Sequence, residues 1–289
     1  MKIKILIPIY NDWQSVFKLL ENINSEVSGL EHEFSVIIVN DGSTETKPEL
    51  STNLENLNSI KIINMKENQG HARCNAIGLK HIFENEQFDY VIPMDGDGED
   101  RPEEIKQFVD NLNYHPDKPI VGERIKRSEG IFFKFCYFIH KIIASTFTGQ
   151  SIKYGNFTCL SKSIVEKMIN DKATWSSFSG SLAKVEKYRA KVPSERGIRY
   201  FGPSKMNFKN LIIHSLSIIS VFKINVLIRS ILFLIVYMFL IHQKISIITL
   251  IPVLLVLTLL ASVFVVSNRE NLEELKNSLS NIKDIDNLK

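Results

Sequence analysis

Continuous apolar runs alternate with amphipathic segments through the first part of the chain. The apolar runs have the length and continuity of buried strands and cover residues 2–9, 34–39, 59–64 and 88–94. Segments with helical spacing or helix-starting residues follow the first, third and fourth runs, at residues 13–23, 68–83 and 102–112. Buried strands that alternate with helices form a mainly parallel sheet that helices cover on both faces. The pattern therefore predicts an α/β fold in which the ligand-binding loops share one edge of the sheet.

The pattern continues less regularly after this repeat. It predicts short strands at residues 119–122 and 154–160, a helix that Ser161 caps, and a weakly strand-like segment at residues 184–193. Residues 131–147 have helical spacing and many aromatic side chains, so they are interpreted as a packed amphipathic helix rather than a lipid-contacting one.

The last third of the chain is apolar and has no acidic residue between Lys205 and Val266. Residues 208–222 are amphipathic and predict a helix in the membrane interface. Residues 224–241 and 245–266 each approach the length of ~20 residues that a helix needs to cross a bilayer. The polar link between them predicts a transmembrane hairpin, although Arg229 leaves open a buried helix of a soluble domain for the first span.

These patterns divide the chain into four predicted parts. They are an α/β domain at residues 1–206, an interfacial helix at 207–223, two transmembrane helices at 224–266, and a charged tail at 267–289. The tail is expected to be helical at first and then loose. Because two spans return the chain to its starting side, both ends are expected in the cytoplasm.

Composition narrows the class of protein. The chain has 35 Lys and Arg against 32 Asp and Glu, a net charge of +3, which does not indicate a nucleic-acid partner. Its three cysteines are widely spaced and contain no CxxC pair, so neither a disulfide framework nor a zinc site is indicated. The short apolar run at the N-terminus predicts a first strand rather than a signal peptide.

A cluster of acidic residues follows the strand at residues 88–94. Asp95, Asp97, Glu99 and Asp100 would emerge at its carboxyl end, where open α/β sheets bind ligands. Carboxylate oxygens in this position suggest a hard divalent cation. The alternative is a solvated acidic turn in front of the helix that begins near Pro102.

Several further motifs accompany this acidic loop. In chain order the motifs are Pro8–Asp12, Val39–Thr44, Asn68–Asn75, Met94–Glu103, Gly122–Arg127 and Ser204-Lys205. Together they resemble the inverting family-2 glycosyltransferases of GT-A fold, in particular the polyprenyl-phosphate sugar transferases. The resemblance covers roughly Ile3 to Val266 and implies a GT-A catalytic domain, Rossmann-like and mainly parallel, at residues 1–206.

The resemblance implies a donor and metal site. The residues expected to bind the nucleotide-sugar, a UDP- or GDP-linked donor, are Pro8, Tyr10, Asn11, Asp12, Asp41, Asp95, Gly96 and Asp97. Asp97 would coordinate Mg²⁺ or Mn²⁺, with Asp95 and Glu99 nearby as further candidate ligands. Asp12 stands where the family usually has Glu, and Glu99 where it commonly has Gln, so Glu99 either ligates the metal or forms a salt bridge.

Basic residues are expected on the acceptor side. Two basic loops contain the residues expected to bind the acceptor phosphate, Arg124, Arg127, Arg199 and Lys205. The resemblance favours Arg124 and Lys205 among them and implies that these two, with Asp95 and Asp97, are catalytic. A lipid phosphate is already an anionic nucleophile, so positioning replaces a strong general base. A solvated basic surface beside anionic headgroups is the alternative for these cations.

The leading hypothesis is a membrane enzyme that moves a sugar from a nucleotide-sugar to polyprenyl phosphate, with inversion, at the cytoplasmic face of a bacterial inner membrane. A family-2 enzyme that uses a hydroxyl acceptor is the alternative, with Asp97 or Asp100 as base. Asn156 bears on this choice, because related lipid-phosphate enzymes often have Asp there. A non-catalytic membrane scaffold is a third hypothesis, and the sugar, the nucleotide and a homo-oligomer are left open.

Overall fold

The computed structural model describes the chain except for residues 50–52, 127–140 and 204–207. The chain divides into two compact units. The first unit comprises Met1–Ser128, Lys153–Lys205 and Asn271–Lys289, and the second comprises Glu129–Ile152 and Met206–Glu270. Each unit is described by itself below.

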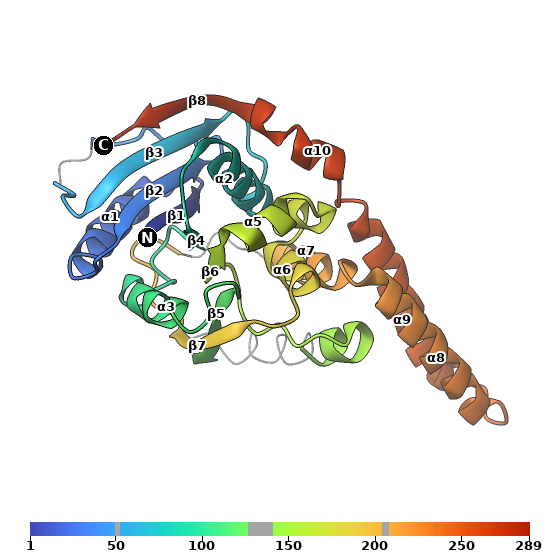
Figure 1. Ribbon diagram of the computed structural model, residues 1–289. Helices are drawn as coiled ribbons and strands as arrows, with labels where there is room; N and C mark the ends of the chain where they lie inside the picture. The colour runs from blue at the N-terminus through green and yellow to red at the C-terminus, as the bar shows by residue number, and fades with distance from the viewer. Residues whose placement is uncertain (50–52, 127–140, 204–207) are drawn as a thin grey trace. The chain divides into compact units, whose positions relative to one another are not determined.

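A mixed sheet forms the centre of the first unit (Figure 1). Among the described residues its strands follow the order β7-β5-β6-β4-β1-β2-β3-β8. The four strands that the sequence predicts first are β1 (Lys2–Ile9), β2 (Glu33–Asn40), β3 (Leu57–Met65) and β4 (Tyr90–Pro93). These four strands are parallel, with β1 between β4 and β2. Their carboxyl ends therefore meet at one edge, as the hydrophobic pattern predicted.

Helices cover both faces of this parallel part. On one face, α1 (Trp13–Glu26) and α3 (Ile105–Leu112), which follows the short helix η1 (Pro102–Glu104), join β1–β3 in one buried cluster. On the other face lies α2 (His71–Asn85), with α5 (Lys162–Ile169) packed against it. The α2 helix lies so close to β1 that a Cβ at Gly78 would come within 2.3 Å of Leu6 Cδ1.

The rest of the sheet mixes strand directions. The strand β6 (Thr158–Ser161) is antiparallel to both β4 and β5 (Ile120–Lys126), and β7 (Ala190–Glu195) is parallel to β5. Two helices precede β7, namely η2 (Lys172–Trp175) and α6 (Phe178–Val185). The strand-like interpretation of residues 184–193 is therefore wrong at its start, because Lys184 lies in α6 and the strand begins at Ala190.

The C-terminal segment is ordered, which corrects the prediction of a loose tail. After α10 (Leu272–Lys276) and η3 (Ser278–Asn281), the strand β8 (Ile282–Asn287) pairs antiparallel with β3 and extends the sheet. Figure 1 shows β8 beside β3 at the end of the sheet. The β8 side chains are mostly exposed, so backbone hydrogen bonds rather than an apolar face hold it there.

Side chains also tie α10 to η2 and α2. Glu274 accepts a hydrogen bond of 2.6 Å from the Trp175 indole and pairs with Arg73 of α2 at 3.4 Å. The Arg73 guanidinium lies 4.9 Å from the centroid of the Trp175 ring, which adds a cation–π contact. Arg73, which follows the Asn68-Gln69-Gly70 turn, thus has a structural partner in the last segment of the chain.

We expect Leu275→Ala to lower the free energy of unfolding of this unit by about 3 kcal/mol. Leu275 is completely buried, so its truncation leaves a cavity under α10. Chemical denaturation measures the change, and Lys276→Ala, an exposed neighbour, should shift stability by less than about 0.5 kcal/mol. Equal stability of Leu275→Ala and the wild type would show that α10 does not support the unit.

A buried ion-pair network joins β1, β3 and the end of α2. Glu86 accepts hydrogen bonds from Lys4 Nζ at 3.0 Å and from Lys61 Nζ at 2.6 Å. The side chains of Glu86 and Lys4 are only 9% and 10% exposed, which limits screening by water. Burial alone would raise the pKa of Glu86, but the two lysines lower it below its ordinary value of 4.5.

We expect Glu86→Gln to destabilise the protein by about 2 kcal/mol at pH 7. Because the folded pKa lies below the unfolded one, the carboxylate contributes fully above pH 4.5, and the contribution is lost as the pH falls through the folded value. Denaturation curves at pH 7 and at successively lower pH check this. A gap between variant and wild type that does not narrow in acid would contradict it.

The second unit is helical in its described part. Residues 141–148 form a helix, followed by α7 (Phe208–Ser220), α8 (Lys223–Ile241) and α9 (Ile247–Ser267). A small core of Ile219, Val226 and Val263 holds them together. The predicted helix at residues 131–147 is described only from residue 141 onward.

Arg229 is paired within this unit. Its Nη1 donates to the carbonyl of Thr146 at 2.8 Å, and Asn225 Nδ2 donates to the carbonyl of Thr148 at 3.2 Å. Both side chains thus satisfy carbonyls at the end of the helix at residues 141–148. The polar residues that interrupt the first apolar span therefore have a local role.

Two helices in the described part of the chain are long and apolar enough to cross a membrane. The first is Lys223–Ile241, and the second begins at Ile247, with mean hydropathies of 2.4 and 2.8. Only 11% of each apolar stretch is buried, which is unlike the core helix of a soluble domain. Large apolar side chains such as Phe239 and Ile247 are 73% and 87% exposed.

Candidate functional site

Asn11, which has a positive φ of 50°, connects the loops after β1 and β2 by hydrogen bonds. Its Oδ1 accepts the backbone N–H groups of Thr44 at 2.8 Å and Glu45 at 3.1 Å, and its own N–H donates to Ser43 Oγ at 2.9 Å. Pro8 is buried below this contact, whereas Tyr10 is 42% exposed. The structure thus brings together the two loops that the motifs predicted, and a nucleotide contact by Pro8, Tyr10 or Asn11 stays a prediction.

Asp41 links the second loop to the start of α2. Its two carboxylate oxygens accept the backbone N–H groups of Gln69 at 2.6 Å and Gly70 at 3.0 Å. Burial raises the pKa of Asp41, although these hydrogen bonds counteract part of the rise. Asp41 therefore shapes the Asn68-Gln69-Gly70 turn, and its contact with a nucleotide stays a prediction.

The acidic loop after β4 is a turn held by its own carboxylates. Asp100 Oδ2 accepts the Asp95 N–H at 2.9 Å, and Asp97 Oδ1 accepts the Glu99 N–H at 3.0 Å. Gly96 lies against β1, where a Cβ would come within 2.8 Å of Ile9 Cγ2. Gly98 has a positive φ of 88°, a backbone conformation that favours glycine. The glycines of the motif thus let the carboxylates crowd around one turn.

A second segment, residues 196–200, lies along this turn. The N–H of Gly197 donates to the carbonyl of Glu99 at 2.8 Å, and the N–H of Tyr200 donates to that of Asp97 at 2.9 Å. These backbone bonds bring the basic residues of the segment to the acidic loop. The sequence contained both charge clusters, but their spacing along the chain did not show that they meet.

Arg199 bridges two of the predicted donor residues. Its Nη1 donates to Asp97 Oδ2 at 2.7 Å, and its Nη2 pairs with Asp12 Oδ2. The side chain is only 14% exposed. The sequence analysis placed Arg199 at the acceptor phosphate, whereas the structure places it against Asp97 and Asp12, two residues predicted to bind the donor. Binding of the acceptor phosphate by Arg199 stays a prediction.

Glu99 forms an ion pair with Arg196. This is the salt bridge that the sequence analysis kept as the alternative to metal ligation. With its Oε2 engaged by the guanidinium, Glu99 is held next to Asp97 but is directed at a protein partner. Direct ligation of a metal by Glu99 stays a prediction.

The carboxylates of the loop titrate unusually. Burial and the nearby charges of Asp95 and Glu99 raise the pKa of Asp97 to about 6. Burial and the charge of Asp95 raise the pKa of Asp100 to about 8, so Asp100 carries a proton at neutral pH. Burial would also raise the pKa of Asp95, but His71, Arg124 and Asn156 lower it below its ordinary value. Asp95 therefore stays ionised to lower pH than Asp97 or Asp100.

Arg124 on β5 faces the acidic loop. Its Nη2 lies 4.0 Å from Asp100 Oδ1, and a Cβ at Gly155 would come within 3.0 Å of the same nitrogen. Gly155 thus leaves room for the guanidinium beside the acidic loop. Of the residues predicted for the acceptor phosphate, Arg124 and Arg199 both lie beside the acidic loop, whereas Arg127 and Lys205 lie outside the described residues.

His71 contacts the same loop, and sequence reasoning missed it. Its Nε2 lies 3.4 Å from Asp95 Oδ1, which also accepts a hydrogen bond of 3.3 Å from Asn156 Nδ2. The sequence did contain one indication that His71 belongs to the site, because it directly follows the Asn68-Gln69-Gly70 turn. The side chain at the first position of a helix can point in several directions, however, and sequence does not fix which.

The acidic loop fits one divalent cation whose other ligands come from elsewhere. Asp12, Asp95, Asp97 and Glu99 crowd around a region where Arg199 already places a positive charge. Among the described residues, however, no group of three or more His, Cys, Asp or Glu side chains is arranged to hold a metal by itself. This suits Mg²⁺ or Mn²⁺ held by one or two carboxylates and by substrate phosphates.

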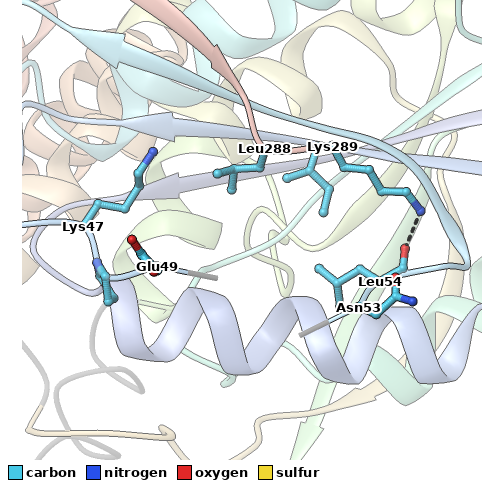
Figure 2. Close-up of a pocket in the computed structure, with 8 residues that line it drawn as sticks. Lys47, Glu49, Asn53, Leu54, Leu288 and Lys289 are labelled. Carbon is cyan, nitrogen blue, oxygen red and sulfur yellow. Dashed lines mark hydrogen bonds between the residues drawn. The ribbon is translucent and has the colours of Figure 1, made fainter. Parts of the chain in front are cut away.

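A cavity of about 560 Å³ lies apart from these residues (Figure 2). Its lining comes from the segment between β2 and β3 and from the C-terminal residues, where Lys289 Nζ donates to the Leu54 carbonyl at 2.7 Å. None of its lining residues belongs to the motifs of the acidic edge. The chemistry of the site therefore lies at the open edge of the sheet and not in this cavity.

Comparison with known proteins identifies the family to which the chain belongs. Residues 4–168 match glycosyl transferase family 2, which is more than half of the chain, so the chain belongs to that family. The undecaprenyl-phosphate 4-deoxy-4-formamido-L-arabinose transferase of Klebsiella pneumoniae (strain 342) is 27% identical over 220 residues. That alignment covers 73% of this chain and 64% of the relative, so the chain spans less than two thirds of the relative's length.

Solved structures agree on the fold. Glucosyl-3-phosphoglycerate synthase from Mycobacterium tuberculosis, crystallised with Mn²⁺ and UDP, has a TM-score of 0.54 at 12% identity, covering 78% of this chain and 79% of that one. A mannosyltransferase from Pyrobaculum calidifontis, in complex with GDP-Man and Mn²⁺, has a TM-score of 0.52 at 13% identity, covering 96% and 74%. The GT-A-like α/β fold that the motifs implied is confirmed.

Proposed function

We propose that the chain transfers a sugar from a nucleotide-sugar to polyprenyl phosphate at a membrane surface, with inversion at the anomeric carbon. The observation that carries this proposal is the similarity over 220 residues to a transferase named for undecaprenyl phosphate. The acidic edge of the sheet and the apolar hairpin supply the two features such a reaction needs, a donor site and a membrane anchor.

The donor would bind across the loops after β1, β2 and β4. In this proposal Tyr10, Asp12 and Asp41 lie beside the base and ribose, and Asp95 and Asp97 lie beside the sugar and diphosphate. Crystallised relatives in fold hold UDP or GDP-Man with Mn²⁺, which supports a nucleotide and a cation at this edge.

Asp97 is the residue that we propose for the metal, with Asp95 and Glu99 close by. A bound Mg²⁺ or Mn²⁺ would stabilise the charge on the leaving nucleoside diphosphate. The protein's own contribution is to present Asp97, whose Oδ2 is held by Arg199. Donor binding must therefore compete with Arg199 for the Asp97 carboxylate.

The acceptor side favours a phosphate over a hydroxyl. A hydroxyl acceptor needs a base, and neither candidate suits that role. Asp97 is engaged by Arg199, and Asp100 has a side chain that is 6% exposed and a raised pKa of about 8, which keeps it protonated at neutral pH. A lipid phosphate arrives already ionised and needs a positive partner instead. Arg124 is that partner among the described residues, and we propose Arg127 and Lys205 as further ones.

The apolar hairpin and the C-terminal strand β8 support a topology with two membrane spans. Because β8 pairs with β3, the chain must return to the side of the first unit after α8 and α9. A pair of spans satisfies this requirement, whereas one span does not. We propose that this side is the cytoplasm, and that α7 lies in the interface as an amphipathic helix.

A transfer assay tests the function. The purified full-length chain is incubated with undecaprenyl phosphate and labelled UDP-glucose, UDP-N-acetylglucosamine or GDP-mannose, with Mn²⁺ or with a chelator. A labelled lipid that forms with at least one donor, and only with the cation, supports the proposal. Failure to form a labelled lipid with any of these donors would contradict the proposal.

A further inference from the structure

Three side chains from separate segments converge beside the donor edge of the sheet. His71 comes from the first turn of α2, Asp95 follows β4, and Asn156 precedes β6. Asn156 Nδ2 lies within hydrogen-bonding distance of both His71 Nε2 and Asp95 Oδ1, and His71 Nε2 is 3.4 Å from the same Asp95 oxygen. Asn75 Nδ2 approaches His71 Nε2 at 3.1 Å and fixes the imidazole from the other side.

The cluster orients the Asp95 carboxylate. Both contacts fall on Oδ1, so the carboxylate cannot rotate without losing them. Asn156 is neutral, and an aspartate in its place would put a second carboxylate about 3.3 Å from Asp95. The carboxylate would also replace the N–H donor that Asp95 Oδ1 accepts with another acceptor. The amide therefore suits a site in which Asp95 must remain an acceptor.

The cluster is also accessible to a ligand. The side chains of His71 and Asp95 are 47% and 28% exposed, which is open for groups that contact one another. Asp97 follows Asp95 by two residues, and Gly155, against which Arg124 packs, directly precedes Asn156. A group bound here would therefore lie near both the proposed metal ligand and the proposed acceptor cation.

We propose that His71 and Asn156 hold Asp95 in place and, together with it, form the subsite that hydrogen-bonds the hydroxyl groups of the donor sugar. The imidazole and the amide offer hydrogen-bonding nitrogen and oxygen atoms, and the carboxylate accepts from a hydroxyl, which is the chemistry that recognises a polyhydroxylated ring. This inference rests on the proposed function, because it presumes a nucleotide-sugar donor.

Binding measurements test the subsite without any acceptor. Dissociation constants of the full-length chain are measured in Mn²⁺ for UDP against UDP-glucose, and for GDP against GDP-mannose. The wild type should bind at least one nucleotide-sugar with an affinity different from that of its nucleoside diphosphate. His71→Ala and Asn156→Ala should each weaken that nucleotide-sugar by about tenfold and leave the nucleoside diphosphate within twofold.

Two further variants sharpen the test. Asn156→Asp should weaken the nucleotide-sugar by a similar factor, because it removes the amide N–H that donates to Asp95 Oδ1. His115→Ala, the same substitution in the turn after α3, should change neither affinity. The melting temperatures should match that of the wild type, which separates a lost contact from a lost fold.

Parallel loss of both affinities in His71→Ala and Asn156→Ala would overturn the inference, since the residues would then act on the nucleotide site as a whole. Unchanged nucleotide-sugar affinity in these variants would overturn it as well. So would a wild type that binds each nucleotide-sugar with the same affinity as its nucleoside diphosphate. Failure of the proposed function looks different, because then neither nucleoside diphosphate binds to the wild type.

Discussion

Replacing Asp97 with Asn should lower sugar transfer by a factor of about 1000 or more while the fold stays intact. A thousandfold loss corresponds to about 4 kcal/mol of transition-state stabilisation, the scale that a metal ion supplies to a leaving group. Asn keeps an oxygen for the Glu99 N–H that Asp97 Oδ1 now accepts, so the turn should persist. The measurements are the transfer rate and the melting temperature with and without Mn²⁺ and nucleotide.

Glu99→Gln is the matched control for this experiment. Glu99 lies two residues from Asp97 but pairs with Arg196, so its loss should change transfer by less than about threefold. If Asp97→Asn kept more than a tenth of the wild-type rate, Asp97 would not be the metal-binding carboxylate. An equal loss in both variants would instead make Glu99 a ligand.

Arg124→Ala should reduce the specificity constant kcat/KM for a polyprenyl-phosphate acceptor by about 100-fold. One charge-assisted contact to a phosphate is worth roughly 1.5–3 kcal/mol, which covers this factor. The Arg124 guanidinium lies 4.0 Å from Asp100, which is too far for a tight ion pair. It can therefore reorient to contact a bound anion. Steady-state kinetics with varied lipid phosphate measure the change, and nucleotide affinity should stay within twofold.

Lys191→Ala provides the control on the neighbouring strand. Lys191 lies on β7, pairs with Glu123 at 3.3 Å and is 60% exposed, so its removal should leave kcat/KM within twofold. A small effect of Arg124→Ala, or an effect that falls on nucleotide affinity instead, would exclude Arg124 from the acceptor side.

The parallel half of the sheet was predictable because its strands are buried on both faces. Continuous apolar runs such as Ile3–Ile9 have no other stable place in a soluble unit, and their polar ends mark the ligand edge. The strand β8 shows where this logic fails. An edge strand is held by backbone bonds, so a charged segment such as Ile282–Asn287 can join a sheet without any hydrophobic signature.

Most residues of the candidate site, His71 excepted, were predictable, but their pairings were not. The motifs identified Asp12, Asp97 and Arg199 separately, but their bridge depends on how the segment at residues 196–200 lies along the acidic turn. Asp41 was expected at the nucleotide, yet its oxygens accept backbone N–H groups, a use that no spacing shows. Long-range contacts of this kind are set by tertiary structure.

The most direct test compares two acceptors that differ only in the phosphate. Transfer from one labelled donor is measured with undecaprenyl phosphate and with undecaprenol at equal concentration, in the presence of Mn²⁺. Rapid formation of a glycosylated lipid phosphate, with at least a hundredfold slower reaction of the alcohol, is the result that we predict. Glycosylation of the alcohol at an equal or higher rate would contradict it.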